Sequence, residues 1–346
     1  MSSSVRMRAL GTAVPPFVLN QIDVQQRATN LFRGQEIERM LPVFANTGIE
    51  RRYSCVPIEW YSEPHGWRER TELYIENALA LLERATIACL DEAKLTREDI
   101  DAIVVASTTG IATPSLDALL VERMNLRRDI KRLPIFGLGC AGGVIGLARA
   151  ADMAKAMPGS NVLFLVVELC ALTFRKDDFS KSNIVAAALF GDGAAGVILN
   201  GKGEGPAIGA GGEYTWPHSL DIMGWDVQED GLKARFAQKI PSLVASDFRD
   251  IYLEFLKAND LQANDIDAYA CHPGGAKVLD ALEAALGMNN GGLEDSRAVL
   301  RDYGNMSAVT MLFVLHRMKD RLNSQRTLAS ALGPGFTCAF LMLEGQ

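Results

Sequence analysis

Three residues of types that can build an activated nucleophile stand far apart in the sequence: Cys140, His272 and Asn305. Cys140 follows the short apolar run Leu133–Gly139 and precedes a run of small apolar residues, which predicts a buried helix that begins at the cysteine. The start of a helix favours negative charge, so we expect the Cys140 thiol to ionise more readily than that of a free cysteine. A cysteine in an apolar run is also a common core residue, and its position alone leaves both interpretations open.

The same stretch allows a dinucleotide-binding turn as an alternative. The segment Gly137–Gly142 is a literal G-x-G-x-x-G between a predicted strand and a predicted helix. Glu168 ends the next apolar run, and it follows the last glycine of the motif at close to the usual interval of a ribose contact. An NAD(P)-dependent oxidoreductase that uses Gly137–Gly142 therefore remains a second hypothesis.

A long-period repeat predicts how the three residues are positioned. Leu95–Ala102 (LTREDIDA) follows a helical pattern and precedes an apolar strand, and Leu261–Ala268 (LQANDIDA) has the same setting in the second half of the sequence. Asn305 follows Cys140 at nearly the same offset and also precedes an apolar helix. Such a repeat indicates a duplicated structural unit.

The duplication predicts an α/β fold with two similar halves, residues 1–200 and 201–346. Each half contributes a buried helix under its sheet, and the two helices should meet near an internal axis. His272 ends the repeated strand, at the edge of the sheet where open α/β folds bind ligands. Cysteine, histidine and asparagine would then converge, as nucleophilic catalysis requires.

Composition restricts the class of protein. The 346 residues are 48% hydrophobic with a net charge of −7, which disfavours a nucleic-acid or anionic-membrane surface. We expect no membrane span and no secretory leader, and therefore a cytoplasmic location. The six cysteines include no C-x-x-C pair, so we expect them to be reduced, and the four scattered histidines give no support for a metal site.

Six motifs carry a resemblance to a known family. Together they resemble the type III polyketide synthases, the chalcone synthase superfamily with its thiolase-like fold, in the pattern of its bacterial members. The resemblance implies a layered α-β-α-β-α core and extends from about Gly11 to the C-terminus. The motifs are Gly139–Gly143, Val167–Phe174, Leu189–Ala195, His272–Gly275, Tyr303–Ser307 and Gly333–Phe336.

The resemblance implies catalytic roles for the three residues. Cys140 would accept a starter acyl group from an acyl-CoA thioester. His272 and Asn305 would hold the thioester oxygen while malonyl-CoA loses CO₂, because fixed donors in a dry pocket stabilise an enolate. A ketoacyl synthase of fatty acid synthesis shares this triad, and a non-catalytic acyl-binding protein could share the fold.

Further residues would bind substrate according to the same resemblance. Cys170, Thr173 and Ala234 are small and uncharged, which favours a fatty acyl starter extended by malonyl-CoA and released as an alkylpyrone or alkylresorcinol. Coenzyme A thioesters would be the substrates, with no resident cofactor, and Arg51 and Arg52 are candidates for contact with coenzyme A. A homodimer is implied, with the loop that contains Thr113 near the interface. The remaining candidate substrate-binding residues are Phe190, Thr108, Thr113, Gly275, Gly335 and Ser307.

Overall fold

A mixed sheet runs through the computed structural model, which describes residues 4–31, 40–237, 239–288 and 291–345. In this part of the chain nine strands follow the order β11-β12-β13-β8-β1-β7-β6-β4-β5. The two halves of the sheet join where β1 meets β8, through the single register pair of Arg6 and Ala207. The strands are β1 (Arg6–Ala13), β4 (Ile100–Ser107), β5 (Lys131–Phe136), β6 (Asn161–Leu169), β7 (Asp192–Asn200), β8 (Ala207–Thr215), β11 (Ala268–Cys271), β12 (Arg326–Gly333) and β13 (Thr337–Glu344).

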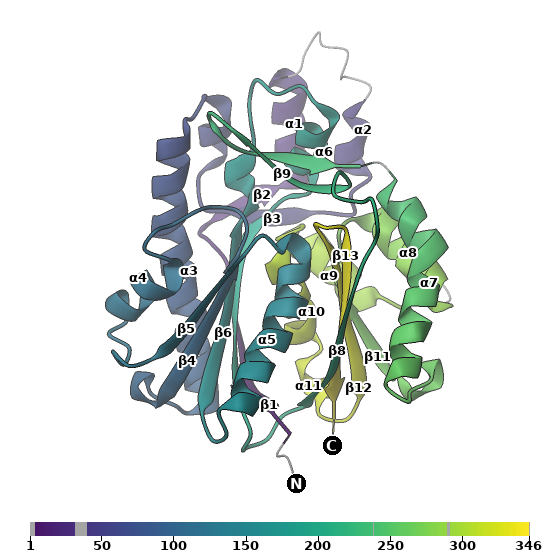
Figure 1. Ribbon diagram of the computed structural model, residues 1–346. Coiled ribbons are helices and arrows are strands. Elements are labelled where there is room, and N and C mark those ends of the chain that lie inside the picture. Colours follow the sequence, from purple (N-terminus) through teal and green to yellow (C-terminus); the bar gives the residue numbers. More distant parts are fainter. Residues whose placement is uncertain (1–3, 32–39, 238, 289–290, 346) are drawn as a thin grey trace.

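Helices cover both faces of each half of the sheet (Figure 1). Alternate residues of β4 show why: Val104 packs on the central helices, whereas Ile103 and Val105 pack in the cluster that contains α3. The predicted α-β-α-β-α layering is confirmed. The outer helices are α3 (Trp67–Ala93) and α4 (Leu116–Arg123) on one side and α7 (Ile240–Ala258), α8 (Ala276–Leu286) and α9 (Glu294–Tyr303) on the other, and the central ones are α5 (Gly142–Ala156) and α10 (Ala308–Arg317), followed by α11 (Lys319–Leu322).

The predicted duplication is visible in local detail. A capping box closes the 3-10 turn before β4, between Thr96 and Asp99, and another closes the turn before β11, between Gln262 and Asp265. Asp101 and Asp267 each accept a hydrogen bond from the first backbone N–H of the neighbouring parallel strand, β6 and β12 respectively. Equivalent sequence positions therefore perform the same task in both halves.

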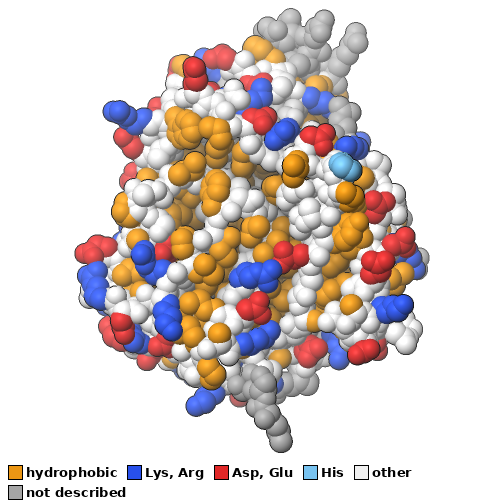
Figure 2. Space-filling model, in the orientation of Figure 1, with side chains coloured by type: hydrophobic (Ala, Val, Ile, Leu, Met, Phe, Trp, Pro, Cys, Tyr) orange, Lys and Arg blue, Asp and Glu red, His pale blue; other side chains and the backbone are white. Residues whose placement is uncertain are grey.

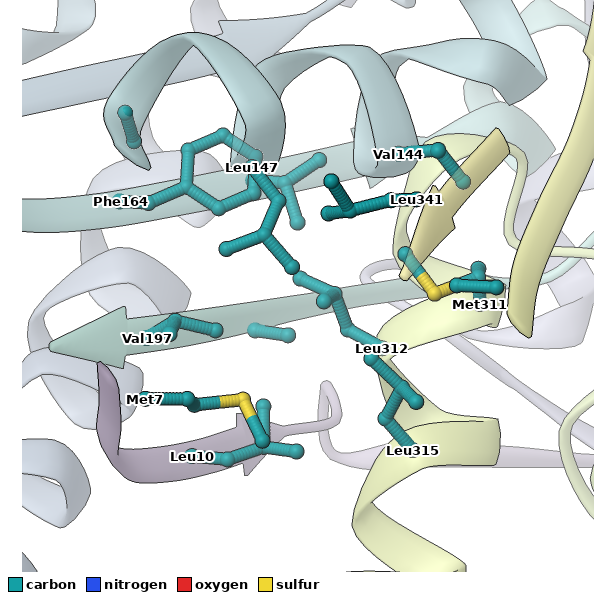
Figure 3. Packing of buried hydrophobic residues seen from close by; sticks show 14 of the residues in the cluster. Met7, Leu10, Val144, Leu147, Phe164, Val197, Met311, Leu312, Leu315 and Leu341 are labelled. Carbon is teal, nitrogen blue, oxygen red and sulfur yellow. The ribbon is translucent and has the colours of Figure 1, made fainter. Parts of the chain in front are cut away.

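The central helices cross closely because small residues line α5. Gly143 packs against the backbone of α10, where a Cβ would overlap the carbonyl oxygen of Ala308. Leu312 and Leu147 are fully buried between the two halves of the sheet, and Figure 3 shows them in one continuous core. Truncation of a leucine in such a core costs roughly 2–5 kcal/mol of stability.

Shorter elements cover one end of the sheet, at the top of Figure 1. None of the described helices combines the length and apolar content that a membrane crossing needs. On the face shown in Figure 2, acidic and basic side chains are interspersed. The covering elements are β2 (Phe17–Asn20), α1 (Gln21–Leu31), α2 (Pro42–Ala45), β3 (Arg51–Ser54), α6 (Lys181–Leu189), β9 (Met223–Gln228) and β10 (Gly231–Phe236).

Candidate active site

Cys140 lies in a 3-10 turn, Gly139–Ala141, that runs directly into α5. Gly139 has φ +49°, a conformation that favours glycine, and a Cβ there would lie 2.5 Å from Cδ of Pro334. Its N–H donates to Oγ1 of Thr108 at 3.0 Å. The turn is thus held by the β12–β13 connection and by the loop after β4, which explains its run of glycines.

The electrostatics of Cys140 differ from the prediction. Burial raises the pKa of the thiol to about 12, and Glu168 acts in the same direction, whereas a hydrogen bond with Ser307 lowers it. The prediction that the helix start makes Cys140 ionise more readily is wrong for the unliganded chain. Its side chain is buried too deeply, at 7% exposed, for the helix terminus to prevail.

Asn305 lies at the start of the second central helix, as the repeat predicts. Its Nδ2 donates to the carbonyl oxygen of Gly274 at 3.2 Å, and its Oδ1 accepts from the N–H of Ser307 at 2.8 Å. These bonds fix the orientation of the amide. Because an amide NH₂ carries two donor hydrogens and Gly274 takes one, a second hydrogen is left for a ligand.

His272 lies directly after β11, where its N–H donates to the carbonyl oxygen of Ser330 at 2.8 Å. Its own carbonyl oxygen accepts from Gly274, the residue that Asn305 contacts. Burial lowers the pKa of His272 to about 4, so the ring is neutral at pH 7. Neither ring nitrogen has a hydrogen-bond partner among the described residues, so both remain available to a substrate.

Hydrogen bonds link Cys140 and Asn305 to the loop that follows His272. Cys140 contacts Ser307, Ser307 contacts Asn305, and Asn305 contacts the Gly274 loop that follows His272. The duplication correctly predicted that corresponding elements of the two sequence halves would meet in space. No group of three histidine, cysteine or acidic side chains in the described ranges could hold a metal ion.

Glu168 has a structural task that excludes the alternative of a ribose contact. Its side chain is fully buried, and its Oε2 accepts from the N–H of Thr108 at 3.1 Å and from Oγ1 of Thr109 at 2.8 Å. Burial raises the pKa of Glu168 to about 8. It holds the loop that in turn binds the turn of Cys140, and the dinucleotide interpretation therefore loses its acidic residue.

A largely apolar cavity lies beneath α1, between that helix and α6. It contains about 640 Å³ of empty space, its open side included. Three of the predicted substrate-binding residues, Cys170, Thr173 and Phe190, lie on its wall. The remaining lining residues are Leu19, Val24, Arg27, Ala28, Leu31, Phe44, Arg52, Ile58, Tyr61, Ser62, Ala171, Phe174, Ala186 and Ala187.

Other predicted residues lie elsewhere. Thr108 and Ser307 lie on other elements and contact the turn of Cys140, as described above. Thr113 is exposed on the loop after β4, outside the cavity of its own chain. Gly275 caps the start of α8, and Gly335 lies in the β12–β13 connection, where its carbonyl oxygen accepts from Ser219.

The candidates for contact with coenzyme A need one correction. Arg51 is exposed on β3, but Arg52 is 2% exposed and lines the apolar cavity. Adjacent residues of a strand point to opposite faces, so only one of the pair could remain at the surface. Arg52 is therefore too buried to contact a phosphate group of coenzyme A at the surface.

The sequence analysis did not predict the aromatic cluster that packs against Phe190, a residue of the cavity wall. The β9–β10 ribbon places Trp225 and Phe236 against Phe190, with ring centroids 6.0 and 5.6 Å away. Trp225 lies on β9, and its distance from Phe190 depends on the fold of a ribbon whose two strands, within the described ranges, pair with each other alone.

Comparisons with known proteins agree with this geometry. Residues 2–203 match the family model "Chalcone and stilbene synthases, N-terminal domain", and residues 213–345 match the corresponding C-terminal domain. A 1,3,6,8-tetrahydroxynaphthalene synthase of Streptomyces peucetius subsp. caesius is 36% identical over 97% of this chain and 92% of its own length. A type III polyketide synthase A of Arabidopsis thaliana is 33% identical over 97% of this chain and 91% of its own. The crystal structure of 1,3,6,8-tetrahydroxynaphthalene synthase from Streptomyces coelicolor A3(2) superimposes with a TM-score of 0.92 and 29% identity, covering 99% of each chain.

Proposed function

The chain belongs to the family of chalcone and stilbene synthases, whose members are type III polyketide synthases with a thiolase-like fold, and on this basis we propose a role for each residue of its site. Sγ of Cys140 attacks the carbonyl of an acyl-CoA thioester, and the departing CoA thiolate takes up the proton that the thiol loses. Neutral His272 has a free ring nitrogen to relay that proton. The single observation that supports these roles best is the hydrogen-bonded junction that joins Cys140, Asn305 and the loop after His272.

The extension step needs donors for a developing enolate. When malonyl-CoA loses CO₂, negative charge forms on its thioester oxygen. The enolate carbon then attacks the acyl group on Cys140 and releases the Cys140 thiolate, which either accepts the next acyl group or takes up a proton from water. The second N–H of the Asn305 amide and an N–H of His272 are the donors for that oxygen. Fixed donors in a site closed to water contribute about 10²–10³ in rate each.

The starter is proposed to be a fatty acyl group, released after extension as an alkylpyrone or alkylresorcinol. The support is the apolar cavity with Cys170, Thr173 and Phe190 on its wall, because each buried CH₂ contributes roughly 0.8 kcal/mol. A tetrahydroxynaphthalene-type product is a second candidate, since relatives carry that activity in their names.

A competition assay tests the starter. The protein receives malonyl-CoA with equal amounts of dodecanoyl-CoA and p-coumaroyl-CoA, and products are identified by mass spectrometry. Products that carry the dodecanoyl chain should dominate. Products from p-coumaroyl-CoA or from malonyl-CoA alone in excess would refute the fatty starter and leave the roles of Cys140, His272 and Asn305 untouched.

Assembly and location also remain proposals. We propose a homodimer in which the exposed loop with Thr113 lies at the interface, next to the unpaired edge of β5. Arg51 is proposed to contact coenzyme A. A cytoplasmic location is supported by the six cysteines, all of which are free.

A further inference from the structure

Arg52 is a buried cation on the wall of a largely apolar cavity. Its side chain is 2% exposed, and its neighbours on that wall include Ala187, Phe190 and Tyr61. The other arginine of the cavity, Arg27, has partners: it donates to Oγ of Ser62 and forms an ion pair with Glu59. Arg52 differs from Arg27 because it has no hydrogen bond to another side chain and no ion pair among the described residues.

The donors of Arg52 are mostly unused. A guanidinium carries five N–H groups, and Nη2 donates to the carbonyl oxygen of Ala187 at 2.5 Å. Nε and Nη1 have no hydrogen-bond partner among the described residues and are shielded from solvent. A buried donor without a partner is unfavourable, and the penalty is larger when the group is charged. A hydrogen bond to an oxygen atom of a bound ligand would remove this penalty.

A carboxylate near Arg52 supplies a negative charge. Asp192 lies close enough to act on Arg52 electrostatically, but its two oxygens accept hydrogen bonds from the N–H groups of Cys55 and Ala171, at 2.9 and 2.8 Å. Asp192 thus supplies a counter-charge to Arg52 but accepts no hydrogen bond from it. Such a site suits a neutral oxygen acceptor, because a second anion would leave the buried group with excess negative charge.

The stem of the Arg52 side chain packs beside the backbone that precedes Asn305. A Cβ at Gly304, the residue before Asn305, would lie 3.2 Å from Cβ of Arg52, and the guanidinium reaches Ala187 on α6. We propose that the free N–H groups of Arg52 bind a keto oxygen of the poly-β-keto chain that grows from Cys140. This inference rests on the proposed function, and it adds a polar contact to a cavity that sequence reasoning took to be uncharged.

Two starters that differ by one keto oxygen test the proposal. The ratio of kcat/KM for 3-oxododecanoyl-CoA to that for dodecanoyl-CoA is measured in the unaltered protein, in Arg52→Gln and in Arg249→Gln. Arg249, on α7, is the matched control because it also donates to a backbone carbonyl, that of Ala285. We expect Arg52→Gln to lower the ratio on the order of tenfold or more, and Arg249→Gln to leave it within about twofold.

The outcomes separate this inference from the proposed function. Dodecanoyl transfer to Cys140, followed by intact-protein mass spectrometry, tests the proposed function by itself. A ratio that Arg52→Gln leaves unchanged overturns the role of Arg52, as does a ratio of one or less in the unaltered protein. If Arg52→Gln does not fold, Arg52→Lys replaces it and should give an intermediate ratio.

Discussion

In the proposed reaction, the buried thiol of Cys140 acts as the nucleophile. Because its pKa is raised to about 12, the thiolate fraction should grow about tenfold per pH unit between pH 7 and pH 10. We expect iodoacetamide to label Cys140 faster as pH rises, with peptide mass mapping as the measurement. Cys89 and Cys338, both fully buried, are the internal controls. Equal labelling rates at all three would contradict the prediction.

Replacement of the nucleophile should separate two steps. Cys140→Ala removes the atom proposed to accept the starter, so mass spectrometry should show no acyl transfer. Slow release of CO₂ from malonyl-CoA should persist, because His272 and Asn305 are unchanged. Asn305→Ala is the complementary variant and should lower CO₂ release about 10²–10³-fold. Loss of CO₂ release in Cys140→Ala and its retention in Asn305→Ala would reverse the assigned roles.

Glu168 makes stability depend on pH. Its pKa is raised to about 8 in the folded chain, above the value of 4.5 for an exposed glutamate, so the folded state binds its proton more tightly. The stabilisation is complete below pH 4.5 and is lost as pH rises through 8. Glu168→Gln imitates the protonated form, and its advantage in melting temperature over the unaltered protein should therefore increase from pH 6 to pH 9. Glu72→Gln, an exposed change on α3, should show no such trend.

Among the elements, the crossing of α5 and α10 leaves no room for added volume at Gly143. Gly143→Ala should lower the free energy of unfolding by roughly 1–3 kcal/mol, because the new Cβ overlaps the backbone of Ala308. Chemical denaturation measures this change. Gly66→Ala is the control, since a Cβ there has nothing within 4 Å. Equal effects of the two substitutions would show that helix contact is not the cause.

Elements with strong local or repeated signals could be predicted from sequence. Apolar periodicity predicted α3 and β4, and the repeat predicted that Asn305 corresponds to Cys140 in the other half. The orientation of Arg52 could not be predicted, because the strand β3 that carries it lies under helices from distant parts of the chain. The prediction of a lowered pKa for Cys140 was wrong for a related reason. The depth at which the thiol is buried depends on β12 and α10, and no local sequence pattern around residue 140 reveals those contacts.

For the whole molecule, the free edge of β5 predicts assembly. β5 ends the sheet, and Leu133 and Phe136 on it are exposed, as is Ile111 on the adjoining loop. Apolar side chains on an unpaired edge favour pairing with a second copy. Light scattering should give a dimer mass, and Phe136→Glu should shift it toward the monomer. Leu220→Glu, at another exposed leucine, is the control and should remain dimeric. A monomer in the unaltered protein would refute the interface.

The position of β1 also determines when the chain can fold during synthesis. β1 leaves the ribosome first, but its neighbour β7 begins only at Asp192, and β8 follows later still. At roughly 5–20 residues per second this delay lasts about 10–40 s, during which β4, β5 and β6 can already pair while the inner edge of their sheet stays open. A chain released before residue 200 would expose that edge to every other nascent chain nearby. We therefore expect prompt completion of translation to limit aggregation of this protein.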